Sequence, residues 1–126
     1  MAHILIIEDN ENNLYLSTFI LEKHGHRVTP ARDGAEGIRL AEELRPDLIL
    51  LDIQLPGMDG YAVAANLRGR DITAAIPIIA VTSYAMAGDR ERILAAGCQG
   101  YIEKPINPET FLDQVLAHLP TDASAA

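Results

Sequence analysis

Three short runs of consecutive apolar residues recur along the chain, and they constrain its fold more than any other feature. They span residues 4–7, 48–51 and 78–81, and two weaker runs lie at 27–29 and 100–102. A strand that is apolar at every position is buried on both faces, which is typical of a parallel sheet covered by helices on both sides. The runs therefore predict five strands of an α/β protein.

The segments between these runs carry the start and stop signals of helices. Asp33 and Glu36 make an Asp-x-x-Glu start of the capping-box type, and Pro46 discourages helix beyond the residue before it. Asp59 can cap a further helix, and Gly25 is placed to end the first one. The last helix shows a single apolar stripe, formed by Phe111, Leu112, Val115, Leu116 and Leu119. Five strands that alternate with five helices predict β-α units in one parallel sheet.

Size and composition limit the protein to one domain and exclude several classes of partner. The chain has 126 residues, 48% of them hydrophobic, and a formal net charge of -8. We expect a single domain over residues 1–126, with a core at 3–119 and a flexible tail at 120–126. A chain this acidic is repelled by nucleic acid and by anionic membranes, so neither direct nucleic-acid binding nor membrane insertion is expected. One cysteine, no signal-peptide features and no apolar run of about 20 residues predict a cytoplasmic protein.

Polar side chains follow four of the predicted strands. Glu8 and Asp9 come after the first strand, Asp52 after the third, Thr82 after the fourth and Lys104 close after the fifth. Taken singly, each has an ordinary explanation as a helix entry, a turn or a solvated side chain. Because the carboxyl ends of parallel strands meet at one edge of the sheet, these groups are expected to converge there.

Three carboxylates at one edge repel one another, and without compensation at least one pKa rises. Lys104 is one available compensation, and a hard divalent cation is the other. Mg²⁺ prefers oxygen ligands, so Asp9, Asp52 and a backbone carbonyl suit it. A transition metal is disfavoured because the four histidines show no ligand spacing and Cys98 is the single cysteine. A metal, a carboxylate, an ammonium and a hydroxyl together indicate phosphoryl transfer to a carboxylate nucleophile.

Five stretches together resemble the receiver domains of bacterial two-component response regulators, and the resemblance extends over residues 3–119. The stretches are Ile-Glu-Asp-Asn at 7–10, Pro-Asp-Leu-Ile-Leu-Leu-Asp-Ile-Gln-Leu-Pro-Gly-Met-Asp-Gly at 46–60, Ile-Ala-Val-Thr at 79–82, Ala-Ala-Gly at 95–97 and Lys-Pro at 104–105. The resemblance implies a CheY-like sheet of strand order 2-1-3-4-5. It also implies a cis peptide bond between Lys104 and Pro105.

The resemblance implies a phosphoacceptor and a metal site. Asp52 corresponds to the phosphoacceptor and also contacts the metal. Asp9 corresponds to a direct Mg²⁺ ligand, Glu8 to one that acts largely through water, and the backbone carbonyl of Gln54 to the third protein ligand. Mn²⁺ is expected to be able to substitute for Mg²⁺. Many receivers have Asp where this chain has Glu8, a difference that should alter a water-mediated contact more than it weakens the metal site.

The same resemblance implies a switch. Lys104 corresponds to the residue that pairs with the acceptor and then with the phosphoryl group, Thr82 to the switch hydroxyl and Tyr101 to the switch aromatic. Gln54 and Tyr84 correspond to positions that flank the path of water to the acyl phosphate, so they are expected to modulate its lifetime. Regulation is then expected to act by changing the affinity for a downstream protein target.

The expected phosphodonor is a histidine kinase or a histidine phosphotransfer protein, which in similar receivers docks on the first helix. The apolar residues of that helix do not fit one narrow stripe, so it is either unusually buried or partly an exposed docking surface. We place Leu14 in the docking interface. Residues 54–56 and 82–89 give a closer likeness to single-domain receivers of the DivK-like type, and also to receivers of hybrid histidine kinases.

Three other classes of protein are alternatives to a receiver domain. An aspartate-nucleophile phosphatase has a second Asp two residues after the nucleophile, where this chain has Gln54, so we do not expect an enzyme that turns over outside substrates. A phosphorylation-independent interaction module on the same fold should lack the acceptor, the acidic pair or the lysine, and all are present. A dinucleotide-binding domain should carry a Gly-x-Gly-x-x-Gly motif after its first strand, and here the acidic pair stands instead.

Overall fold

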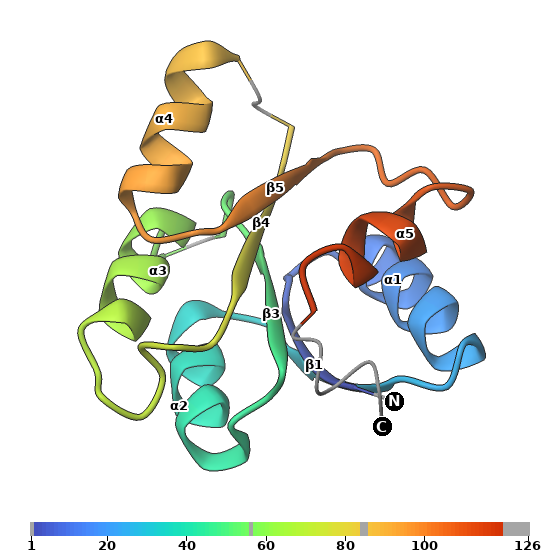
Figure 1. The fold of residues 1–126 in the computed structure, drawn as a ribbon, viewed down its shortest axis with the longest axis horizontal. Coiled ribbons are helices and arrows are strands. Elements are labelled where there is room, and N and C mark those ends of the chain that lie inside the picture. Colours follow the sequence, from blue (N-terminus) through green and yellow to red (C-terminus); the bar gives the residue numbers. More distant parts are fainter. Residues whose placement is uncertain (1, 56, 84–85, 120–126) are drawn as a thin grey trace.

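Five strands and five helices alternate along the described part of the chain (Figure 1). The computed structural model describes residues 2–55, 57–83 and 86–119. The strands are β1 His3–Ile7, β2 Arg27–Ala31, β3 Leu48–Asp52, β4 Ile78–Thr82 and β5 Gly100–Glu103. The helices are α1 Glu11–Lys23, α2 Gly34–Leu44, α3 Gly60–Arg68, α4 Ala87–Ala95 and α5 Phe111–Leu116. The expected tail at 120–126 lies outside the described residues, and the domain limits stay a prediction.

All five strands are parallel and pair in the order β2-β1-β3-β4-β5. The order confirms the expected CheY-like topology. Ile7 is opposite Leu51, and Asp52 is opposite Val81. The carboxyl ends of β1, β3 and β4 therefore lie next to one another at one edge, and β5 ends beside β4.

Successive residues of each strand point to opposite faces of the sheet, and both faces are covered. On one side α2, α3 and α4 pack on the sheet, and on the other side α1 and α5 do (Figure 1). Leu5 and Leu51 belong to the first of these cores, whereas Ile4 and Leu50 belong to the second. This double coverage explains why the central strands are apolar at nearly every position.

Helix ends follow the signals in the sequence. Asp33 accepts a hydrogen bond from the backbone N–H of Glu36 at 2.8 Å and begins α2, and Asp59 caps α3 by accepting from the N–H of Ala62 at 2.9 Å. Gly25 follows α1 with φ of 87°, a conformation that glycine adopts without steric cost. The peptide bond between Lys104 and Pro105 is cis, as the resemblance implied.

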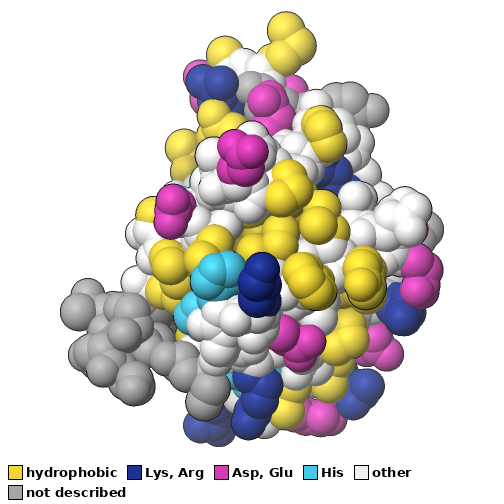
Figure 2. Space-filling view, turned by 90° about the vertical axis from the view of Figure 1, so that its right-hand side faces the viewer, with side chains coloured by type: hydrophobic (Ala, Val, Ile, Leu, Met, Phe, Trp, Pro, Cys, Tyr) yellow, Lys and Arg dark blue, Asp and Glu magenta, His cyan; other side chains and the backbone are white. Residues whose placement is uncertain are grey.

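Helix α1 has both a buried face and an exposed apolar face. Leu14 and Leu21 are buried against the sheet, whereas Tyr15 is 71% exposed and Phe19 is 52% exposed. The rings of Tyr15 and Phe19 are stacked, with centroids 6.3 Å apart. Figure 2 shows the face that α1 and α5 form, where hydrophobic side chains gather. The helix therefore supplies core on one side and an apolar surface on the other.

Among the described residues, no helix is both long enough and apolar enough to cross a membrane.

Candidate functional site

The polar groups that follow the strands meet at the carboxyl edge of the sheet. Asp52 and Thr82 are the last residues of β3 and β4. The apolar runs predicted them directly after these strands, so each strand is one residue longer than expected. Glu8, Asp9 and Asp52 each place one carboxylate oxygen within 4.8 Å of the other two. The expected convergence of the three carboxylates is confirmed.

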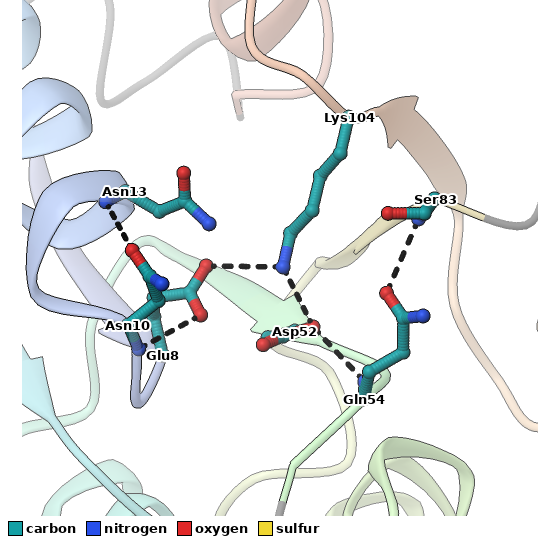
Figure 3. A network of polar contacts seen from close by, with 7 residues as sticks. All are labelled: Glu8, Asn10, Asn13, Asp52, Gln54, Ser83 and Lys104. Atoms are coloured by element: carbon teal, nitrogen blue, oxygen red, sulfur yellow. Dashed lines mark hydrogen bonds and ion pairs between the residues drawn. The ribbon is translucent and has the colours of Figure 1, made fainter.

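Lys104 lies between two buried carboxylates. Its Nζ is 3.1 Å from Oδ1 of Asp52 and 3.4 Å from Oε1 of Glu8 (Figure 3). Asp52 is 3% exposed and Glu8 4% exposed, while Asp9 is open to solvent. Because buried charge pairs interact more strongly than exposed ones, this ammonium is a principal electrostatic partner of Asp52 and Glu8.

Backbone amides hold the two buried carboxylates in place. The N–H of Gln54 donates to Oδ1 of Asp52 at 2.9 Å, and the N–H of Asn10 donates to Oε2 of Glu8 at 3.3 Å. Asn10 also caps α1, since its Oδ1 accepts from the N–H of Asn13 at 2.9 Å. The sequence does not indicate the contact between Asn10 and Glu8, although an Asn directly before a helical segment is a known capping signal.

The site carries more negative charge than Lys104 offsets. Burial and, after it, the neighbouring Asp52 raise the pKa of Glu8 to about 7, although Lys104 acts in the opposite direction. Glu8 therefore carries a proton for part of the time near neutral pH. A cluster of hard oxygen donors short of positive charge fits Mg²⁺, which takes oxygen ligands and retains several waters.

A glycine lets α3 approach the end of β3 closely. A Cβ on Gly60 would lie 2.4 Å from the Cα of Ile53 and 2.8 Å from the carbonyl oxygen of Asp52. The N–H of Gly60 donates to the carbonyl of Ile53 at 2.9 Å. We did not predict this residue as part of the site, because nothing in its local sequence shows what it packs against.

Two further predicted site residues lie on β5 and α1. Tyr101 is half-buried on β5, and the guanidinium carbon of Arg90 lies 5.3 Å from the centroid of its ring. Leu14 is 6% exposed and helps line a groove of about 240 Å³ beside α1. The groove is lined by Glu11, Leu14, Tyr15, Thr18, Pro30 and Arg32. Tyr84 lies outside the described residues.

Residues 4–116 match the family described as the response regulator receiver domain. The chain therefore belongs to the response regulator receiver family of two-component signalling, as the sequence resemblance indicated. The strand order and the acidic cluster agree with this membership.

Three relatives show which members of the family this chain is similar to. The polar-differentiation response regulator DivK of Brucella anthropi is 45% identical over 116 residues, which cover 92% of this chain and 94% of that protein. The chemotaxis protein CheY4 of Vibrio cholerae has a similar structure, with a TM-score of 0.90, 28% identity and coverage of 94% of this chain and 99% of that one. The receiver domain of the sensor histidine kinase PA1611 of Pseudomonas aeruginosa, solved with magnesium in its active site cleft, gives a TM-score of 0.85 and 37% identity over 93% of this chain and 96% of that one. The expected DivK-like character is confirmed.

Proposed function

We propose that this chain is the phosphoacceptor of a two-component phosphorelay, in which Asp52 receives a phosphoryl group from a phosphohistidine. The observation that carries the proposal is the buried Asp52 carboxylate, which the Gln54 amide and Lys104 hold beside the acidic pair of Glu8 and Asp9. Asp52 attacks the phosphorus, the N–P bond breaks, and its electron pair returns to the donor imidazole.

The acidic cluster suits a divalent ion. Asp9, Asp52 and the backbone carbonyl of Gln54 would hold Mg²⁺, and Glu8 would reach it through water. When bound, the ion neutralises charge on the transferring group. Mn²⁺ can replace it because the ligands are oxygens. The magnesium in the related receiver of PA1611 supports this proposal.

Once Asp52 is phosphorylated, the chain's own residues carry the signal. The Lys104 ammonium, which pairs with two carboxylates at rest, turns to the phosphoryl oxygens. The Thr82 hydroxyl moves toward the same group, and Tyr101 turns into the space that Thr82 leaves. The surface of β4, β5 and the helices after them then changes its affinity for a downstream protein target, on the allosteric scale of about 5- to 150-fold.

The phosphodonor, a histidine kinase or a histidine phosphotransfer protein, docks on α1. Leu14 contributes the buried floor of the groove there, while the exposed Tyr15 and Arg32 stand at its surface. Replacing Tyr15 by Ala should slow transfer from the protein donor, while the rate with acetyl phosphate stays unchanged. Equal slowing with both donors would contradict the docking role.

Tyr84 is proposed to shield the acyl phosphate from water, together with Gln54. A Tyr84→Ala variant should then lose its phosphoryl group faster than the wild type. Equal dephosphorylation rates would leave Tyr84 without this role.

The decisive experiment measures intact mass after incubation with acetyl phosphate and Mg²⁺. We expect the wild type to gain one phosphoryl group and Asp52→Asn to gain none. A gain that persists in Asp52→Asn would move the acceptor elsewhere. No turnover of a generic phosphoester is expected, because the chain promotes only its own phosphorylation and dephosphorylation.

A second candidate is the receiver of a hybrid histidine kinase, favoured by the 37% identity to the receiver of PA1611. The chemistry at Asp52 is the same in both cases, but the donor is then a kinase domain of the same protein. Comparing phosphotransfer rates from several purified kinases separates the two candidates, since a free-standing receiver should accept from a separate kinase.

A further inference from the structure

Gln54 makes two hydrogen bonds that point in different directions (Figure 3). Its backbone N–H donates to Oδ1 of Asp52 at 2.9 Å. Its side-chain Oε1 accepts from the backbone N–H of Ser83 at 3.3 Å. Ser83 directly follows Thr82, the last residue of β4. A chain of two hydrogen bonds thus runs from the acceptor to the start of the β4–α4 connection, and it does not involve the Thr82 side chain.

The N–H of Ile53 donates to the carbonyl of Val81 at 3.2 Å, and the Gln54 side chain adds a second contact between these segments farther along the chain. Gln54 and Ser83 are both exposed, so their contact depends on the hydrogen bond and not on burial of apolar surface. The N–H of Ser83 belongs to the peptide bond that joins it to Thr82, so a displacement of the Thr82 backbone moves this N–H as well. The bond to the Gln54 side chain therefore opposes that displacement.

Phosphorylation weakens the other end of the same chain. An acyl phosphate uses one Asp52 oxygen for the new bond and removes the carboxylate charge, so the N–H of Gln54 loses a charged acceptor. Hydrogen bonds to charged acceptors are about twice as strong as those between neutral groups. The modification that attracts Thr82 thus also loosens the residue that restrains Ser83.

We propose that Gln54 is a positioning residue that ties the β4–α4 connection to the acceptor strand in the unphosphorylated protein and so holds the switch at rest. This proposal rests on the phosphoacceptor function proposed above for Asp52. It assigns the Gln54 side chain a conformational role, separate from its carbonyl in the metal site and from any effect on water.

Gln54→Met tests the tie, because Met has nearly the same length and keeps the backbone groups but offers no oxygen acceptor. Gln114→Met, at an exposed position of α5, is the matched control. The probe is beryllofluoride with Mg²⁺, which mimics a phosphoryl group and cannot be hydrolysed. Loss of one hydrogen bond shifts an equilibrium by about three- to tenfold. We therefore expect Gln54→Met to reach half-saturation at a beryllofluoride concentration lower by about that factor, and Gln114→Met to match the wild type.

The chemical shift of the Ser83 amide, measured by NMR, distinguishes this role from a general effect on the structure. The Ser83 signal of unliganded Gln54→Met should shift toward its position in the beryllofluoride-saturated wild type. Equal or weaker beryllofluoride binding by Gln54→Met, or a Ser83 signal unchanged from that of the wild type, would overturn the tie. Failure of the wild type to bind beryllofluoride would overturn the phosphoacceptor function together with the tie, so the two failures are distinguishable.

Discussion

Lys104 shows how one side chain can have opposite effects on two properties of a site. The chain has only two lysines, and this one lies between the carboxylates of Asp52 and Glu8 at 3.1 and 3.4 Å. The other, Lys23, is exposed on α1 and lies over the ring of Phe19. An ammonium beside a carboxylate cluster assists a negatively charged phosphoryl group but competes with a divalent cation for the same oxygens.

Replacing Lys104 by Met should therefore separate phosphorylation from metal binding. We expect phosphorylation by acetyl phosphate to slow by about 100-fold, the usual effect of removing one group that stabilises transition-state charge. Mg²⁺ affinity should increase, because the competing charge is gone. Mass spectrometry follows the first property and calorimetry the second.

Lys23→Met is the control and should leave both properties unchanged. Parallel loss of metal affinity and phosphorylation in Lys104→Met would show that the lysine only maintains the structure of the site.

Cys98 is a second residue whose surroundings set its chemistry. It is 4% exposed, and burial raises the pKa of its thiol from the ordinary 9.0 to about 11. An unfolded chain therefore releases this proton at lower pH than the folded one does. The contribution of the thiol to stability is complete below pH 9 and is lost as the pH rises toward 11.

The free energy of unfolding of the wild type, compared with that of Cys98→Ala, should fall by about 1.4 kcal/mol for each pH unit between 9 and 11. Urea unfolding at several pH values measures the difference, in which the titration of all other groups cancels. A difference that stays constant over this range would mean that the thiol is not shielded from solvent.

At the scale of elements, the glycines in α3 and α4 have different functions. Gly60 begins α3 against the backbone of Ile53 and Asp52, so a side chain there meets atoms that cannot rotate away. Gly88 lies in the first turn of α4, and a Cβ there would meet no atom of the described residues within 4 Å, apart from its chain neighbours and its own helix backbone. The first glycine is required by packing, and the second is not.

Gly60→Ala should lower the free energy of unfolding by about 1–3 kcal/mol, the cost of overpacking, and should slow phosphorylation because the end of β3 is displaced. Gly88→Ala should leave stability unchanged or raise it by up to about 1 kcal/mol, since Ala favours helix over Gly. Thermal unfolding and the acetyl phosphate reaction measure both variants. Equal effects of the two substitutions would show that helix propensity, and not close approach, sets the requirement at Gly60.

At the scale of the whole molecule, negative charge is concentrated where the parallel sheet gathers its strand ends. The chain has a net charge of -8, and three of its carboxylates share the carboxyl edge. Divalent binding there should stabilise the folded state, because the unfolded chain does not bring these carboxylates together.

Each tenfold increase in Mg²⁺ concentration above the dissociation constant should stabilise the folded state by about 1.4 kcal/mol. Each kcal/mol of this stabilisation should raise the melting temperature by about 4 °C. NaCl at equal ionic strength is the control for general screening of the acidic chain, and EDTA should reverse the effect. Asp9→Asn should reduce the Mg²⁺ response but not the NaCl response. Identical shifts with the two salts would argue against a specific site.

Much of this structure could be predicted because its signals are local. The apolar runs mark the strands, the capping residues Asp33 and Asp59 begin helices where expected, and the residues at the strand ends lead to the acidic edge. Parallel strands share one edge, so knowing where each strand ends was enough to bring distant carboxylates together.

The rest depended on distances between segments that are far apart in the chain. The amphipathic pattern of α1 did not show that Leu14 is buried while Tyr15 faces solvent. The close packing of Gly60, the reach of Gln54 to Ser83 and the raised pKa of Glu8 also arise only when β1, β3, β4 and α3 lie side by side. The sequence by itself determined which groups gather at the edge of the sheet, whereas the tertiary structure decided how they share charge and hydrogen bonds, because both interactions depend on separations of a few ångströms.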